Sequence, residues 1–90
     1  MDSIWKYPIK TDDSQRLEMP LGAEILSVQV QKNEPFIWAR VSTNNPKAFR
    51  ELRIFGTGHA MDENFNGVHV GTYQIYGGDL VFHVFDMGWQ

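Results

Sequence analysis

The sequence predicts an all-β domain of about seven antiparallel strands with little or no helix. Apolar and polar residues alternate along most of the 90-residue chain, whereas apolar residues at helical spacing are almost absent. Turn-forming residues separate the alternating segments. No linker, repeat or low-complexity segment interrupts residues 1–90. We therefore expect a single domain, a meander that closes into a compact sandwich or a small barrel.

The first half of the chain contains four of these strands. The first is short, and Pro8 confines it to a sheet edge because proline cannot donate to a neighbouring strand. The last two form a hairpin, because residues 32–35 are turn residues. In order, the strands are Ser3–Ile9, Gln15–Met19, Glu24–Gln31 and Phe36–Ser42.

The register of this hairpin separates a core face from an outer face. With Asn33-Glu34 at the centre of the turn, the apolar residues of both strands pair on one face, as a core face should. The other face carries Trp38 and Arg40, opposite Gln29 and Ser27. The core pairs are Val30 with Ile37, Val28 with Ala39 and Leu26 with Val41.

The second half contains a fifth strand, Ala48–Gly56, and a hairpin. Residues 43–46 form the loop before the fifth strand, and residues 59–67 form the loop after it, with one helical turn around Met61-Asp62-Glu63. The hairpin strands are Val68–Tyr76 and Asp79–Met87, around Gly77-Gly78. This turn places Ile75, Tyr73 and Gly71 opposite Leu80, Phe82 and Val84 on the core face. On the other face, Thr72 lies beside His83 and Val70 beside Phe85.

The outer faces of these strands combine aromatic and cationic side chains that a soluble monomer rarely leaves bare. We expect a second layer, a second subunit or a ligand to cover them, and we predict a homo-oligomer, either a dimer or a tetramer. The residues concerned are Trp38, Arg40, Arg53, Phe55, His83 and Phe85.

Composition excludes several classes of partner. The net charge is −3, and the Lys and Arg residues are scattered singly, so a long nucleic acid is not an expected partner. The absence of Cys excludes disulfides and thiolate metal sites. No segment is apolar over the length that crosses a bilayer, so we expect no membrane association and a cytosolic location.

The stretch Gly56-Thr57-Gly58-His59 follows the fifth strand and supports two interpretations. Glycines let the backbone approach a ligand, and the intervening groups offer N–H, O–H and ring-nitrogen contacts to an anion such as a phosphate. The alternative is a bulged strand exit with a capped turn. The stretch lacks the Lys of a nucleotide-hydrolysing loop and the third Gly of a dinucleotide fingerprint, so only static binding is compatible with it.

Trp38 and Arg40 lie two residues apart and point the same way. A flat ring stacks on a nucleobase, and a guanidinium pairs with a phosphate; the alternative is packing under a neighbouring subunit. The predicted ligand-binding set is Trp38, Arg40, Arg53, Phe55, Gly56, Thr57, Gly58 and His59.

Catalytic and metal chemistry have no positive support in the sequence. His59, His69 and His83 match no compact metal-ligand spacing. Asp62 and Glu63 lie in a polar loop where nothing raises their pKa, and no nucleophile-elbow pattern is present. We therefore expect no catalytic residues, no metal site, no cofactor and no enzymatic activity.

Several motifs together resemble a family of small phage-encoded proteins, identified as the anti-CBASS nucleotide sponges. The resemblance covers nearly the whole chain in order, and departs mainly at residues 43–47 and 87–90. The motifs are Ile4-Trp5-Lys6-Tyr7-Pro8, Glu18-Met19-Pro20, Gly22-Ala23, residues 25–31, Trp38-Ala39, Phe55-Gly56-Thr57-Gly58-His59, Gly71-Thr72-Tyr73-Gln74 and residues 78–85.

The resemblance implies a phage immune-evasion protein in the host bacterial cytoplasm. Such a protein binds a cyclic dinucleotide alarm signal, such as cyclic GMP–AMP, in a multi-subunit assembly without cleaving it. The resemblance assigns no ligand contact to an individual residue. Two other functions stay open at this point: an inhibitor that docks its aromatic face on a host defence enzyme, and a structural oligomeric phage protein.

Overall fold

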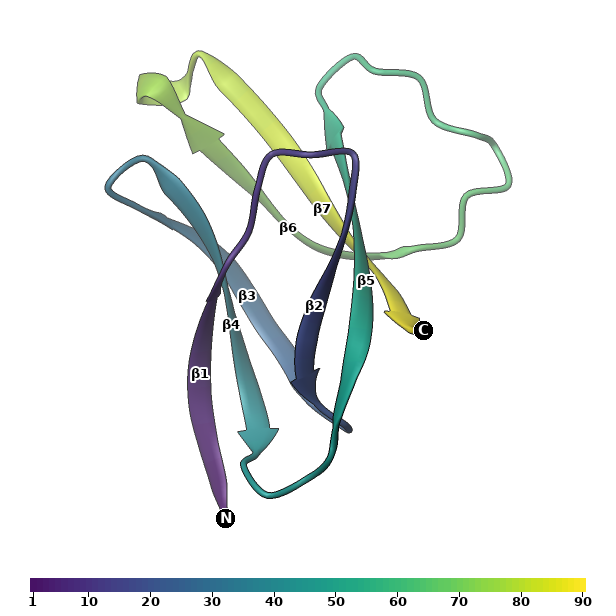
Figure 1. Cartoon of the computed structure of the whole chain (residues 1–90). Helices are drawn as coiled ribbons and strands as arrows, with labels where there is room; N and C mark the ends of the chain where they lie inside the picture. Colours follow the sequence, from purple (N-terminus) through teal and green to yellow (C-terminus); the bar gives the residue numbers. More distant parts are fainter.

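The computed structural model describes residues 1–90 as two antiparallel sheets packed face to face (Figure 1). Sheet A has the strand order β1-β4-β3, and sheet B has the order β2-β5-β7-β6. A single 3-10 turn, η1, is the only helical segment, and no helix has the length and apolar character needed to cross a membrane. The elements are β1 (Asp2–Pro8), β2 (Ser14–Pro20), β3 (Glu24–Gln31), β4 (Glu34–Ser42), β5 (Lys47–Gly56), β6 (Val68–Ile75), η1 (Tyr76–Gly78) and β7 (Leu80–Trp89).

The prediction of an all-β sandwich of seven strands is confirmed, but the chain is not a meander. Only the pairs β3–β4 and β6–β7 are neighbours both in sequence and in a sheet. The other connections lead from one sheet to the other or pass over a strand, so that β1 lies beside β4 and β2 beside β5. The strands form two sheets because each sheet is apolar on one face, and that face is removed from water only when it packs against another layer.

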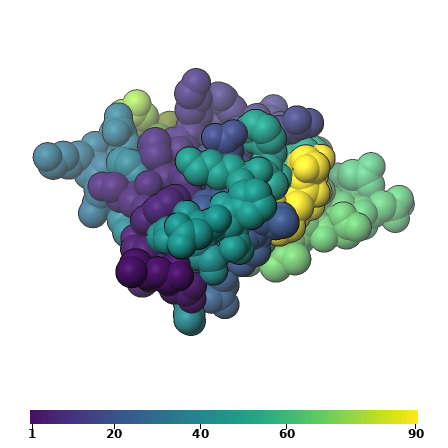
Figure 2. All heavy atoms as spheres, turned by 60° about the horizontal axis from the view of Figure 1, so that its bottom comes forward, coloured from purple at the N-terminus to yellow at the C-terminus, as the bar shows by residue number.

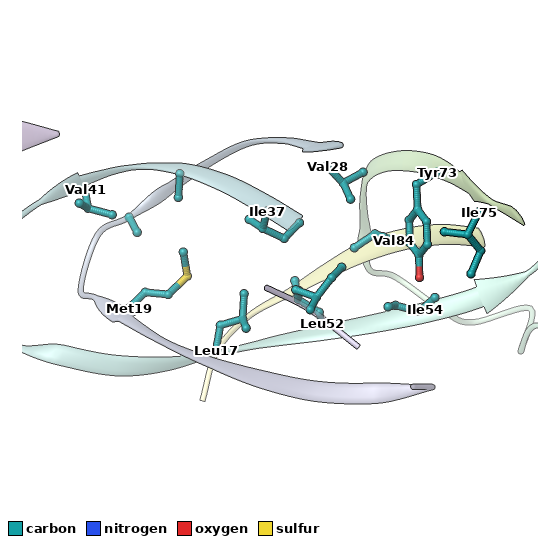
Figure 3. Close-up of a cluster of buried hydrophobic side chains, with 13 residues drawn as sticks. Leu17, Met19, Val28, Ile37, Val41, Leu52, Ile54, Tyr73, Ile75 and Val84 are labelled. Carbon is teal, nitrogen blue, oxygen red and sulfur yellow. The ribbon is translucent and has the colours of Figure 1, made fainter. Parts of the chain in front are cut away.

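The core lies between the two sheets and contains side chains from all seven strands or the loops beside them (Figure 3). Met19, Ile37, Leu52 and Val84 are fully buried at its centre. Tyr73 is buried among them and its hydroxyl reaches Thr11 Oγ1 at 2.8 Å, so its polar atom is satisfied. The core residues are Ile9, Leu17, Met19, Ala23, Val28, Ile37, Ala39, Val41, Leu52, Ile54, Tyr73, Ile75 and Val84.

The predicted register of the β6–β7 hairpin is confirmed from residue 71 to residue 84. The structure pairs Ile75 with Leu80 and Gly71 with Val84, as expected from a turn centred on Gly77-Gly78. Beyond this point the prediction was wrong, because a β-bulge at Val70 makes His69, rather than Val70, the partner of Phe85. The bulge is what places a second imidazole on the outer face.

The predicted register of the β3–β4 hairpin was wrong by two residues. The turn is centred on Lys32-Asn33, with φ values of +51° and +64°, and Gln31 pairs with Glu34 rather than with Phe36. A two-residue turn with positive φ at both positions matches the twist of the flanking strands, and Asn tolerates that conformation well. Because the shift is even, the side chains keep the faces that the sequence predicted.

A second departure in this hairpin concerns Leu26, which was predicted to belong to the core. A β-bulge between Ile25 and Ser27 leaves Leu26 without a partner in β4, and its side chain is 46% exposed. Ile25 pairs with Ala39 in its place and packs against the core. The bulge inserts one residue and thereby reverses the alternation at that end of the strand.

The loop between β5 and β6 contains no helical turn, so the prediction of one around Met61-Asp62-Glu63 was wrong. The Asp62 carboxylate instead accepts a hydrogen bond from the Asn64 backbone N–H at 2.7 Å, and the Phe65 N–H donates to the Asp62 carbonyl at 3.0 Å. An Asp side chain that bonds two residues ahead favours a tight turn over a helix. The loop projects as a lobe from one end of the sandwich, green in Figure 2.

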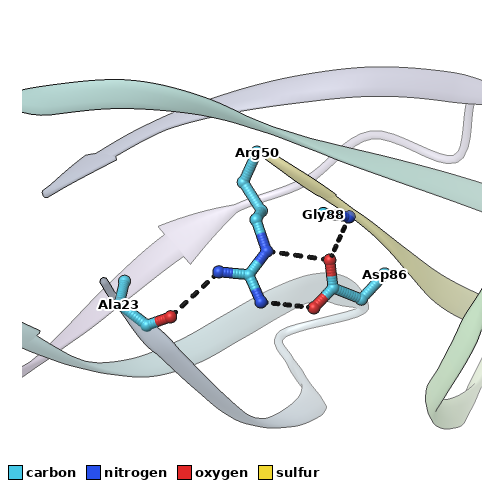
Figure 4. Close-up of polar contacts among 4 residues, drawn as sticks. All are labelled: Ala23, Arg50, Asp86 and Gly88. Atoms are coloured by element: carbon cyan, nitrogen blue, oxygen red, sulfur yellow. Dashed lines mark hydrogen bonds and ion pairs between the residues drawn. The ribbon is translucent and has the colours of Figure 1, made fainter. Parts of the chain in front are cut away.

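An ion pair that the sequence analysis did not single out joins three segments at one end of the sandwich (Figure 4). Arg50 of β5 donates to both carboxylate oxygens of Asp86 in β7 and to the carbonyl of Ala23, which precedes β3. The two side chains are only 14% and 15% exposed. Burial opposes ionisation of Asp86, yet hydrogen bonds from Arg50 and from the Gly88 N–H hold its pKa below the ordinary value of 3.8.

Candidate functional site

The eight residues predicted to bind ligand do not meet in one site within a single chain. Trp38 and Arg40 lie on the outer face of sheet A, because their neighbour Ala39 faces the core. Arg53 and Phe55 lie on the outer face of sheet B, because Ile54 faces the core. The sandwich therefore separates the set into two patches on opposite sides of the molecule.

The patch on sheet A has its cation already paired. Arg40 forms an ion pair with Asp2 of β1, with 2.9 Å between Nη2 and Oδ2, and the Asp2 carboxylate also accepts from Ser42. Hydrogen bonds from Ser42 and Arg40 lower the pKa of Asp2. Trp38 packs edge-on against Phe36, with 6.0 Å between ring centroids. This patch therefore has no free arginine to offer an anion.

The patch on sheet B contains a closed aromatic cluster. The rings of Phe55, Phe65 and Phe85 meet edge to face, with centroid separations of 5.1 to 5.8 Å. Phe65 comes from the loop between β5 and β6, and its ring packs against the rings of Phe55 and Phe85. Each ring is only partly exposed as a result. The predicted need for a covering layer is thus met here in part by the chain itself.

Next to this cluster, two threonines and two histidines from β6, β7 and the turn after β5 form a chain of hydrogen bonds. His83 of β7 bonds through Nε2 to the Thr57 hydroxyl at 2.8 Å and through Nδ1 to the Thr72 hydroxyl at 2.9 Å. The Thr72 hydroxyl also lies 3.3 Å from Nε2 of His69 in β6. Both ring nitrogens of His83 are therefore held by hydroxyls, which fixes the ring without giving it a carboxylate partner.

The stretch from Gly56 to His59 forms a turn that closes the end of β5. The His59 N–H donates to the Gly56 carbonyl at 3.0 Å, and Gly58 has a φ of +89°, the value that the third residue of a type II turn requires. The Thr57 N–H donates to the Val81 carbonyl at 3.1 Å. Two of the N–H groups that the phosphate interpretation needed are thus used inside the chain, and the backbone has the geometry of the alternative, a capped strand exit.

His59 lies between two hollows on either side of this turn. Its ring rests against Gly56, where a Cβ atom would come within 2.9 Å of the ring. On one side is an open hollow of about 540 Å³ that ends at the β6–β7 turn. On the other is a hollow of about 220 Å³ that leads to Arg53 and Phe55. The larger hollow is lined by Gly56, Thr57, His59, Asp79, Leu80, Val81 and Phe82, and the smaller by Asp13, Arg53, Ile54, Phe55, His59 and Ala60.

Arg53 is the cation of the smaller hollow, and it differs from the other partly buried arginine in having no carboxylate partner. The only ion pairs in the structure are Arg40–Asp2 and Arg50–Asp86. Arg53 donates through Nε to the Asp13 carbonyl at 3.3 Å, and its guanidinium lies 5.7 Å from the centre of the Phe55 ring. These contacts orient the guanidinium and leave its terminal nitrogens free.

These features together give a site with the chemistry to hold a ligand. A partly buried guanidinium, an imidazole and an aromatic edge can hold an anionic, partly flat ligand. The Asp13 and Asp79 side chains at the rims disfavour dense negative charge at those two points. No group of three or more His, Cys, Asp or Glu side chains is placed to share a metal ion.

Sequence reasoning missed part of this site. It paired Thr72 with His83 correctly, but it did not connect Thr57 to them, because Thr57 directly follows β5 and the β5–β7 pairing that brings it beside His83 leaves no mark in a local pattern. It also missed Phe65, which was read only as a loop residue. The available signal was an aromatic residue inside an otherwise polar loop, since burying such a ring stabilises the folded protein and exposing it to water is unfavourable.

A family model described as a domain of unknown function (DUF7352) matches residues 1–89. The chain therefore belongs to this family. No curated protein matches the chain, and no solved structure matches it.

Proposed function

We propose that this DUF7352 member is a non-catalytic binding protein that holds a small anionic ligand beside Arg53, at the end of β5. The single observation that carries the proposal is the state of Arg53. The residue is partly buried and its guanidinium is oriented by Phe55 and the Asp13 carbonyl, yet it lacks an anionic partner. Because its terminal nitrogens are free, an external anion can form charge-assisted hydrogen bonds with this guanidinium.

The size and chemistry of the surroundings favour a ligand with both charge and flat rings. The larger hollow, about 540 Å³, falls within the range of pockets that hold small organic molecules. Val81 and Phe82 give it an apolar wall, and His59 connects it to the guanidinium in the smaller hollow. A nucleotide matches both surroundings, because its phosphate needs a cation and its base needs an apolar surface.

Within this class we propose a cyclic dinucleotide such as cyclic GMP–AMP, which is the ligand that the resemblance to the anti-CBASS nucleotide sponges implies. Binding without cleavage would make the protein a sponge for the signal. In this proposal it acts in the cytoplasm of the infected bacterium, where it lowers the free concentration of the immune messenger. His83 supports binding over cleavage, because hydroxyls rather than a carboxylate hold both of its ring nitrogens.

The proposal is tested by calorimetric titration of the protein with cyclic di- and trinucleotides, followed by mass spectrometry of the recovered ligand. Arg53→Ala should weaken binding by about 1.5–3 kcal/mol, or roughly 10- to 100-fold, because it removes a charge-assisted contact. The ligand should be recovered intact from the wild-type protein.

Arg16→Ala is the matched control. Arg16 is an exposed arginine on β2 of the same sheet, forms no ion pair and lies away from both hollows. Its loss changes the net charge by the same amount and should leave affinity unchanged. Equal weakening by both substitutions would reduce the effect to overall charge, and a cleaved product would refute the non-catalytic part of the proposal.

The sequence-based hypothesis of binding on sheet A is tested in the same titration. Trp38→Ala and Arg40→Ala should leave affinity unchanged if the ligand binds only beside Arg53. Weakening by these two, with Arg53→Ala without effect, would move the site to the opposite side of the molecule and contradict the proposal.

A further inference from the structure

Strand β1 forms an open edge of sheet A. Only β4 lies beside it, and no other strand covers its far side (Figure 1). The hydrogen bonds at its two ends fix which residues face β4: the Met1 carbonyl accepts from the Thr43 N–H, and the Ile9 N–H donates to the Pro35 carbonyl. Backbone groups alternate in direction along a strand, so the even-numbered residues of β1 direct their N–H and C=O groups toward the open edge.

The even-numbered residues of this edge are self-complementary. Ile4 lies at the middle with its side chain 61% exposed, Asp2 precedes it by two residues and Lys6 follows it by two. In an antiparallel pair centred on Ile4, each Asp2 lies opposite the Lys6 of the other copy, and Ile4 lies opposite itself. All the outward-directed N–H and C=O groups from Asp2 to Lys6 then find partners.

Other registers of the same edge are less favourable. Centring the pair on Trp5 places Pro8 opposite Asp2, and proline has no N–H to donate. Centring it on Lys6 places two like charges opposite each other, which is destabilising. The sequence of β1 therefore selects the register centred on Ile4.

Of the other edge strands, β3 and β6 lie against each other, and β2 can pair Arg16 with Glu18 only in a register that has the buried Leu17, and no exposed apolar side chain, at its centre. The even-numbered residues of β2 face outward from β5, since the Asp13 carbonyl accepts from the Ile54 N–H and the Leu21 N–H donates to the Pro46 carbonyl. A pair centred on Arg16 would place that arginine opposite itself. Leu17 lies between the outward-facing Arg16 and Glu18, but its side chain is buried in the core and is not available at the edge.

We propose that two copies of this chain associate through β1, antiparallel and in the register Ile4 to Ile4, so that the two copies of sheet A form one continuous sheet. The interface has two-fold symmetry and closes with two subunits. Asp2 already carries one ion pair with Arg40, but its side chain is 46% exposed and can accept Lys6 of the other copy as well. The proposal is independent of the ligand proposed for sheet B.

The dimer also extends the outer face of sheet A across the junction. Arg40 lies beside Ile4 of β1. A row of four side chains therefore crosses the junction: Arg40 and Ile4 of one copy, followed by Ile4 and Arg40 of the other. Two exposed isoleucine side chains are thereby placed together, which removes apolar surface from water. The two Trp38 rings then lie on one continuous face.

The register is tested by disulfide cross-linking, because the chain contains no cysteine of its own. Ile4→Cys should give a covalent dimer on mild oxidation, since directly opposed residues of this kind of pair have Cα atoms about 5.5 Å apart, within the range of a disulfide. Pro8→Cys is the matched control on the same strand. In the proposed register residue 8 extends beyond the end of the other copy's strand, so this variant should not cross-link.

The association itself is tested by light scattering at micromolar to millimolar concentration. The wild-type protein should show the mass of two chains, Lys6→Glu should shift the equilibrium to monomer, and Arg16→Glu on β2 should keep the dimer. Circular dichroism and melting temperature establish that the variants are folded. A monomeric wild type, equal cross-linking of the two cysteine variants, or a dimer that Lys6→Glu leaves unchanged would each overturn the proposal.

Discussion

The outer faces of the two sheets carry similar residues in different settings. Each has an arginine and aromatic rings, and both were predicted to bind ligand. On sheet A, Arg40 is paired with Asp2 and Trp38 lies on an open surface. On sheet B, Arg53 has no carboxylate partner, and a loop covers the rings beside it. The difference shows that an arginine near an aromatic ring indicates a binding site only when the fold leaves its charge unpaired.

A third arginine shows what pairing is worth when water is excluded. Arg50 and Asp86 are more than four-fifths buried, whereas Arg40 and Asp2 are largely exposed. An exposed pair contributes little because water screens it, while removal of one member of a buried pair leaves an uncompensated charge. The exposed pair and the buried pair therefore give the lower and the upper limit of what an ion pair contributes to the free energy of unfolding of this protein.

The largest expected effect is that of Asp86→Asn. We expect a loss of about 3 kcal/mol in the free energy of unfolding, because the Arg50 guanidinium keeps its burial and loses its counter-charge. Urea denaturation measures it. Asp2→Asn removes the exposed pair and should leave the unfolding midpoint nearly unchanged, and equal losses in the two variants would show that burial does not separate the pairs.

A second test compares the aromatic residues of the two faces. Phe85→Ala should cost about 2 kcal/mol, less than a fully buried phenylalanine, because Phe85 contacts Phe55, Phe65 and His69 but remains partly exposed. Trp38→Ala should cost less, about 1 kcal/mol, because its ring contacts one aromatic neighbour, Phe36, where the Phe85 ring contacts three. Thermal melts of monomeric protein distinguish the two, and a larger loss at Trp38 would reverse our assignment of the covered face.

The turn at the end of β5 gives a sharper comparison, between Gly56 and Gly58. Gly58→Ala should lower stability by about 1 kcal/mol through its positive φ and should barely change affinity, because a Cβ there meets no atom within 4 Å. Gly56→Ala should weaken ligand binding, because the new Cβ displaces the His59 ring. Melting temperature and affinity are measured on both; a loss of affinity at Gly58 with unchanged stability would restore the phosphate-loop interpretation.

The smallest effect is the acid dependence of stability. The folded-state pKa of Asp86 lies below 3.8, so its contribution is complete above that pH and is lost as pH falls through the lower folded-state value. Wild-type protein should therefore lose stability below about pH 4 more steeply than Asp86→Asn, as denaturation at several pH values would show. Asp2 also has a lowered pKa, so Asp2→Asn should flatten the slope as well, but less because its ion pair is exposed; an unchanged slope in Asp86→Asn would contradict the assignment.

The sequence by itself predicted the strands, their faces and one hairpin register. These features depend on local alternation and on turn residues, as in the match of Gly71 with Val84. It failed where a single inserted residue reverses a face, as at Leu26 and Val70, because a bulge has no signature in a binary pattern. It also misplaced the first turn, where two adjacent centres were compatible with the same faces.

Only the tertiary structure decided which candidate residues share a site. Trp38 and Arg53 both point away from the core, and nothing in the alternation says that they do so on opposite sides of a sandwich. That depends on which strands pair, a choice made by contacts between segments far apart in the chain. The same pairing gave Arg40 and Arg50 their carboxylates and left Arg53 without one, because whether a charge is compensated is a property of neighbours in space, not in sequence.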